Sequence, residues 1–141
     1  MNKDKLKKLI YDLEQESREI DKSIRLFKKY IDDREMKTEF SNSLKYKYLS
    51  LFILYEDFIS MLLKEYNLYK IGMTVDGAIK KLNEEKILTE EITNYLNTAR
   101  LLRNRIGHRY KQPKIEEILE FLENNTEIKN KMEEYIKSYL K

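Results

Sequence analysis

The side chains best suited to chemistry in this sequence lie in one short run, from Arg103 to Tyr110. It contains the only histidine of the chain, His108, five positions after Arg103 and two positions before Tyr110. Imidazole is the one side chain whose ordinary pKa lets it act as acid and as base near neutral pH. A fixed cation, a proton-exchanging ring and a phenol are thus crowded at the end of a predicted helix. Any histidine-based catalysis in this chain must occur here.

Basic residues surround the histidine, with no acidic residue among them. They are Arg100, Arg103, Arg105, Arg109 and Lys111. A run of charge is usually a solvated helix face, but its coincidence with the single histidine favours a surface that contacts RNA. The formal net charge of +3 is compatible with RNA as a partner and does not require it.

The composition excludes several other kinds of site. The absence of cysteine excludes disulfides, zinc–thiolate sites and thiol catalysis. There is no glycine-rich phosphate loop and no nucleophile elbow, and no spacing singles out a carboxylate pair among the 25 acids. We therefore expect neither a metal nor a cofactor. No apolar run approaches the roughly 20 residues of a membrane span, and residues 1–5 lack an apolar signal region, so we expect a cytoplasmic protein without membrane contact.

Three glycines and one proline leave few breaks, which predicts long helices and an all-α fold. The first helix is expected over residues 3–33, and the second over 38–69 with Thr38 as its N-cap. The first carries apolar residues at alternating spacings of four and three, with one polar member: Leu6, Ile10, Leu13, Ser17, Ile20, Ile24, Phe27 and Ile31. The second is apolar over most of its circumference, which places it at the centre of a bundle or in a subunit interface.

Four shorter elements complete the expected fold. Gly72 closes the second helical region, and Thr74 and Thr89 are the predicted N-caps of the third and fourth helices. Pro113 is expected in the first turn of a fifth helix, and the pair Asn124–Asn125 separates it from a last one. The sequence therefore predicts a single domain over residues 1–141, an antiparallel bundle of about five to six helices.

The periodicity of the fourth helix predicts the directions in which its arginine side chains point. Its apolar face continues at a spacing of four and three into Arg103, whereas Arg105 points almost oppositely and Arg100 lies on the border. One of these arginines is therefore aimed inward and the others are not. An inward arginine needs an anion, a carbonyl or a wet cleft. Two alternatives remain: an ion pair with a carboxylate of another helix, or a cleft shared with His108.

Gly107 decides whether the second alternative is possible. In a continuous helix, residues 103 and 108 would be separated by roughly 140° and would not meet. A break at Gly107 would let His108 turn toward the side on which Arg103 emerges. We therefore predict that the helix ends or distorts near Gly107, although glycine is also common as an ordinary C-cap.

The segment Arg103-x4-His108-x-Tyr110, with Asn104 after the arginine, resembles the signature of the HEPN superfamily. More narrowly, it resembles the HepT-like toxins of HEPN–MNT toxin–antitoxin pairs, in which a nucleotidyltransferase is the antitoxin. The resemblance is strongest from about residue 72 to 122, where a short helix and a turn precede the motif helix. The long first helix and the basic Arg109 and Lys111 are particular to this chain.

The resemblance implies a homodimeric bundle in which two copies of the motif face one cleft, and a metal-independent endoribonuclease activity. It implies that Arg103 and His108 are the catalytic pair and that Asn104 supports them. It also implies that Tyr110 is the tyrosine that a cognate nucleotidyltransferase antitoxin modifies with AMP. Since one histidine supplies one proton-transfer role at a time, a symmetric dimer would bring the second.

Two other functions agree with the same residues. The first is a non-catalytic interaction module that uses the heptad pattern and the tyrosine-rich second helix to bind a partner or to dimerise. The second is a nucleotide- or RNA-binding domain without turnover that uses the arginine cluster, and its binding would be sensitive to salt.

Overall fold

The computed structural model describes residues 1–141 and contains six helices and no strand. They are α1 (Lys3–Lys29), α2 (Arg34–Glu65), α3 (Val75–Glu84), α4 (Glu90–Ile106), α5 (Ile115–Asn124) and α6 (Thr126–Ser138). The all-α prediction is confirmed, and the number of helices agrees with it. None of the six combines the length and apolar character needed to cross a membrane.

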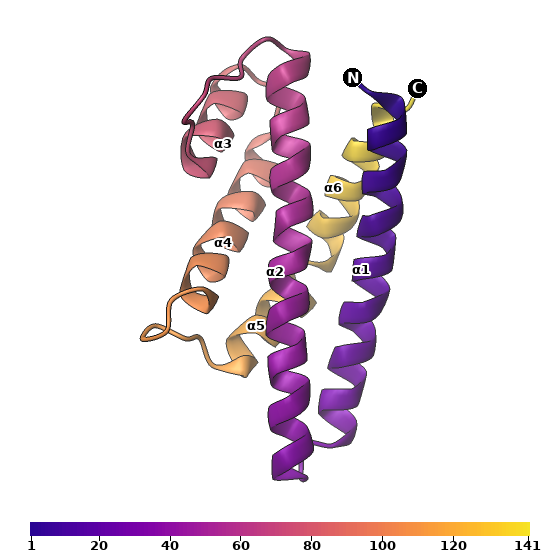
Figure 1. Ribbon diagram of the computed structural model, residues 1–141, viewed down its shortest axis with the longest axis vertical. Coiled ribbons are helices and arrows are strands. Elements are labelled where there is room, and N and C mark those ends of the chain that lie inside the picture. The colour runs from indigo at the N-terminus through magenta and orange to yellow at the C-terminus, as the bar shows by residue number, and fades with distance from the viewer.

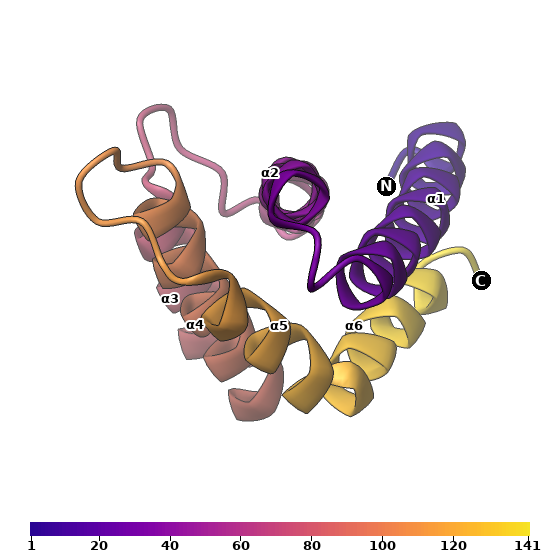
Figure 2. The same cartoon turned by 90° about the horizontal axis from the view of Figure 1, so that it is seen from below.

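The two long helices form an antiparallel hairpin, and the four short ones pack along it (Figure 1). Seen along the hairpin, α2 lies between α1 with α6 on one side and α3 with α4 on the other (Figure 2). Its Tyr48, Tyr55 and Phe58 are among the most completely buried side chains of the chain. These contacts agree with the first alternative for the second helix, a position between the other helices, although one side of α2 is left uncovered (Figure 2).

The predicted start of the second helix is wrong by four residues. The Asp33 carboxylate accepts a hydrogen bond from the Met36 backbone N–H at 3.1 Å and caps α2. Thr38 lies inside the helix, where its hydroxyl donates to the Arg34 carbonyl at 3.0 Å. Because α1 ends at Lys29 and a short turn follows, Ile31 lies in that turn and is exposed, outside the predicted apolar seam.

The predicted end of the second helix is also late by four residues. The helix ends at Glu65, and Asn67 then adopts the left-handed conformation, with φ of 58°. The Leu68 N–H closes the helix end by donating to the Leu63 carbonyl at 2.7 Å, as in a Schellman motif. Gly72, with φ of +84°, does not end this helix but lies in the connection that follows it.

The helix starts after residue 72 agree better with the sequence. The Thr74 hydroxyl accepts from the Gly77 N–H, and the Thr89 hydroxyl accepts from the Ile92 N–H, so both predicted N-caps are confirmed. Of the pair predicted to separate the last two helices, Asn125 lies between α5 and α6, whereas Asn124 is the last residue of α5. Pro113 precedes Lys114, the N-cap of α5, so the prediction that it lies in the first turn of the helix is wrong.

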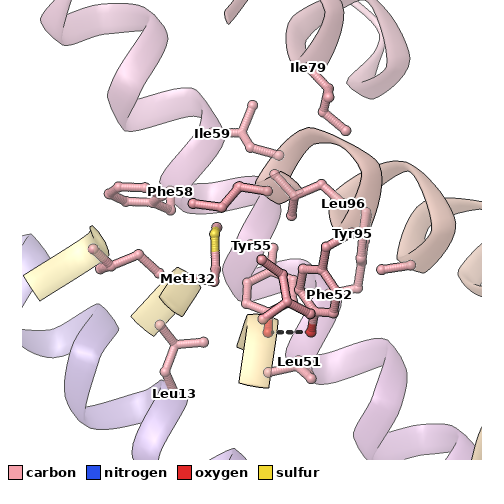
Figure 3. Packing of buried hydrophobic residues seen from close by; sticks show 14 of the residues in the cluster. Leu13, Leu51, Phe52, Tyr55, Phe58, Ile59, Ile79, Tyr95, Leu96 and Met132 are labelled. Carbon is pink, nitrogen blue, oxygen red and sulfur yellow. Dashed lines mark hydrogen bonds between the residues drawn. The ribbon is translucent and has the colours of Figure 1, made fainter. Parts of the chain in front are cut away.

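Buried tyrosines join α2 to α4. The hydroxyls of Tyr55 and Tyr95 are 2.8 Å apart and hydrogen-bonded to each other (Figure 3), and the Tyr48 hydroxyl donates to the Ala99 carbonyl at 2.7 Å. Burial raises the pKa of Tyr55 and Tyr95, so both phenols remain neutral. Each of these three tyrosine hydroxyls thus has a partner, and the bonds fix α4 along α2.

The hydroxyl pair between Tyr55 and Tyr95 should be cooperative. We expect Tyr55→Phe and Tyr95→Phe each to cost about 1–3 kcal/mol, because each leaves the other hydroxyl buried without a partner. The double variant should lose less than the sum of the two. Urea denaturation followed by circular dichroism measures this coupling, with the exposed Tyr11→Phe as a control that should change stability by less than about 0.5 kcal/mol. Strictly additive losses would contradict the bond.

Candidate functional site

The last turn of α4 carries the candidate site. The helix ends at Ile106, so the predicted break near Gly107 is confirmed. The break does not depend on the conformational freedom of glycine, because Gly107 has φ of −74° and ψ of −8°. A Cβ placed there would lie 3.5 Å from the Arg103 carbonyl oxygen, which is an ordinary contact. Gly107 therefore acts as an ordinary C-cap.

Arg103 lies between two polar partners and an aromatic ring. Its Nη1 donates to Oε1 of Glu56 on α2, and its Nε donates to Oδ1 of Asn104 at 2.9 Å. Its guanidinium lies 4.7 Å from the ring centroid of Phe52. The first alternative, an ion pair between Arg103 and a carboxylate of another helix, therefore describes the contact that Arg103 makes. However, the side chain remains 27% exposed, and its Nη2 donates no hydrogen bond to the protein.

His108 lies in the loop that begins directly after α4, and it is exposed. Its Nδ1 accepts a hydrogen bond from the Tyr110 backbone N–H at 3.3 Å. In the neutral ring the proton is then on Nε2, which is free of protein contacts. The Tyr110 ring lies 6.3 Å from the imidazole, centroid to centroid, and 84% of this tyrosine is exposed. An acid–base group and a phenol are therefore both open to a ligand.

Gln112 holds this loop against the end of α4. Its side-chain N–H group donates to the carbonyl of Ile106, to that of His108 at 3.1 Å and, more weakly, to that of Arg105 at 3.4 Å. The last carbonyls of a helix have no partners within the helix, so a side-chain donor there stabilises the turn. The sequence did not identify Gln112, because this residue belongs to no motif with a recognisable spacing.

The neighbouring cations do not form one continuous face. Arg105 makes two hydrogen bonds to Glu117 of α5, at 2.5 and 3.3 Å, and the bond from Arg105 lowers the pKa of Glu117. Arg100 pairs with Asp76 of α3 at 3.3 Å, and its side chain is only 17% exposed. It is therefore more buried than Arg103, and the prediction that only Arg103 points inward is wrong. Acidic residues of other helices therefore pair with part of the basic run.

Arg109 and Lys111 differ from these paired arginines. Neither makes a salt bridge, and both are exposed in the loop. The Arg109 guanidinium lies 5.8 Å from the ring centroid of Tyr110. The loop thus presents the unpaired positive charge of this end of the molecule.

The structure brings Arg103 together with Asn104, as predicted, and adds Glu56, which the sequence did not single out. The side chains of Arg103 and His108 make no direct hydrogen bond, and the Gly107 N–H donates to the Arg103 carbonyl at 3.0 Å as at an ordinary helix end. No group of three or more His, Cys, Asp or Glu side chains is arranged to hold a metal ion.

The loop should depend on Gln112 rather than on Gly107. We expect Gln112→Ala to release residues 107–111 from the end of α4 and to increase trypsin cleavage after Arg109 several-fold, because the variant loses the side-chain bonds to the helix end. Gly107→Ala should keep both the loop and the melting temperature, since its φ suits alanine. Limited proteolysis of the two variants beside wild type tests this, and equal protection of Gln112→Ala would contradict the assignment.

Comparisons with known proteins add no relative to these observations. No family model matches the chain, and no curated protein or solved structure matches it. The resemblance to the HEPN signature therefore rests on the segment from Arg103 to Tyr110 and its helical setting.

Proposed function

We propose that this protein is a metal-independent endoribonuclease, with Arg103 and His108 as its catalytic pair. The observation that carries the proposal is the arrangement at the end of α4. Glu56 and Asn104 hold Nη1 and Nε of Arg103 while Nη2 stays unbound, and the exposed His108 follows on the adjoining loop. A guanidinium with free N–H donors is suited to a phosphate, and an open imidazole to proton transfer.

The proposed reaction uses the ribose 2′-hydroxyl as the nucleophile, so no metal is needed to activate water. Arg103 stabilises the charge that gathers on the phosphate through its free N–H donors. Asn104 orients Arg103, and Tyr110 hydrogen-bonds to the phosphate or stacks on a base. Arg109 and Lys111 contact flanking phosphates. Arg100 and Arg105, which keep their carboxylate partners, contribute less to RNA binding.

The proposed assembly is a homodimer formed through the uncovered face of α2. Figure 2 shows α2 uncovered on the side away from α5 and α6. That face carries the exposed Tyr46 and Ile53, with the half-buried Leu49 between them. Ile53 lies three positions before Glu56 on the same helix, so the apolar face continues into the site. A second copy of the chain bound to this face would bring two candidate sites into one cleft.

The proposed regulation is that of a toxin–antitoxin pair in the cytoplasm. Tyr110 is exposed enough for an enzyme to reach its hydroxyl, and it lies beside His108. AMP attached by a cognate nucleotidyltransferase antitoxin would add bulk and negative charge where the RNA phosphate binds. Such a modification would block the site by both means.

Glu56 also supports the non-catalytic reading, because an arginine that pairs with a carboxylate can be purely structural. An interaction module predicts that no RNA is cut, and a binding domain without turnover predicts salt-sensitive binding of intact RNA. Both are outcomes of the following experiment.

Cleavage of total cellular RNA by the purified protein tests the proposed activity. We expect cleavage in the presence of EDTA, ends that carry 2′,3′-cyclic phosphate and 5′-hydroxyl groups, and no cleavage at a position with a 2′-deoxyribose. His108→Ala should lose cleavage by about 100-fold or more. Its melting temperature should stay at the wild-type value, because His108 is exposed.

Arg103→Ala should lose cleavage as well. Unfolding of this variant would favour the structural ion pair. Full activity of His108→Ala, or a strict need for magnesium, would contradict the mechanism. RNA that is bound but intact would favour the binding domain.

Oligomeric state tests the proposed interface separately. We expect wild type to sediment as a dimer and Tyr46→Asp to sediment as a monomer, because the charge would lie at the centre of an apolar contact. Tyr11→Asp is the matched control, since Tyr11 is similarly exposed but lies on α1. Analytical ultracentrifugation distinguishes these states, and a dimer that persists in Tyr46→Asp would exclude this face.

A further inference from the structure

The family resemblance assigns no role to Glu56. Its carboxylate nevertheless contacts Arg103, beside which the proposed reaction needs a proton acceptor. Its side chain, on α2, is 30% exposed, and only Oε1 is used in the ion pair with Arg103. Glu56 also lines a cavity of about 170 Å³, together with Ile59, Tyr69 and Val75. Its other carboxylate oxygen, Oε2, makes no hydrogen bond to the protein.

The proposed reaction requires two proton transfers at opposite ends of the phosphate. The 2′-hydroxyl must lose a proton, and the leaving 5′-oxygen must gain one. Only Nδ1 of His108 has a protein partner, the Tyr110 backbone N–H, and Nε2 makes no hydrogen bond to the protein. In the charged ring both nitrogens carry protons and the contact to Tyr110 is released, so the Nε2 proton can be given to the leaving oxygen.

We infer that Glu56 is the general base of the proposed ribonuclease and that His108 is its general acid, both within one protomer. The inference rests on the proposed function. Arg103 connects the two elements, since its Nη1 contacts Glu56 on α2 and His108 lies five positions after it, in the loop that follows α4.

In the reaction, a Glu56 oxygen takes the proton of the 2′-hydroxyl as the 2′-oxygen forms its bond to phosphorus. The bond from phosphorus to the 5′-oxygen breaks, and that oxygen takes the Nε2 proton of the charged His108. The products are a 2′,3′-cyclic phosphate and a 5′-hydroxyl. Glu56 is left protonated and His108 neutral, and exchange with water restores both. A dimer is then needed for the shape of the cleft and not for a second histidine.

The two roles are separated by an RNA oligonucleotide that carries a sulfur in place of the 5′-oxygen at the mapped cleavage position. A thiolate leaves without being protonated, so this substrate no longer needs the general acid. We expect His108→Ala to recover most of the wild-type rate on it, whereas Glu56→Gln stays about 100- to 10,000-fold slower on both substrates. Glutamine can still accept the hydrogen bond from Arg103, so this variant removes the base and keeps the contact.

The pH dependence of kcat gives a second readout that a structural role would not change. Wild type should lose activity on the acidic side, because only an ionised carboxylate can accept the proton of the 2′-hydroxyl, and Glu56→Gln should lose that dependence. Glu56→Asp, which keeps a carboxylate, should retain the acidic limb with part of the activity. Glu117→Gln is the matched control, because Glu117 pairs with Arg105 of the same helix α4, and its kcat and pH profile should match wild type.

Each other result has a definite meaning. The assignment of Glu56 would be overturned if Glu56→Gln kept a normal kcat or changed only in KM. It would also be overturned if the sulfur substrate rescued Glu56→Gln instead of His108→Ala. Each of these results would leave the proposed ribonuclease activity intact. If the wild-type protein cleaves no RNA, the proposed function is overturned, and this inference with it. Melting temperatures of all variants separate these outcomes from a loss of fold.

Discussion

The ion pair between Glu56 of α2 and Arg103 of α4 is the contact on which the candidate site depends. It joins residues 47 positions apart in the sequence and holds a guanidinium at the edge of the apolar core. An unpaired charge at that depth would be costly, and a fully buried pair would be inert. Partial exposure avoids both, because the cation is held through Nη1 and Nε and keeps Nη2 free for a phosphate.

The core determines where this pair forms. Tyr48 and Tyr55 of α2 bond to α4 through Ala99 and Tyr95, in the turns that precede Arg103. Because a helix turns by about 100° per residue, fixing these turns also fixes the direction in which Arg103 leaves the helix. The apolar packing of α2 and α4 thus sets the geometry of a polar site, and α4 ends where its loop can present His108.

The fold was largely predictable from local patterns, and the site only in part. Few breaks and the apolar spacing predicted the helices, and Thr74 and Thr89 marked two starts correctly. The start of α2 was misjudged because Asp33 and Thr38 are both good N-caps, and only the turn from α1 selects between them. Arg103 was predicted to point inward from its angular position alone. Glu56 was not predictable, because its pairing depends on how two distant helices pack.

A structure of the His108→Ala variant with an uncleaved RNA oligonucleotide would test the central claim most directly, since the variant keeps the ion pair and removes the proton donor. The account predicts a phosphate bound to Nη2 of Arg103, with the ribose 2′-hydroxyl on the side of Glu56 and the leaving oxygen toward residue 108. RNA bound elsewhere on the molecule, with Nη2 of Arg103 unoccupied, would contradict it.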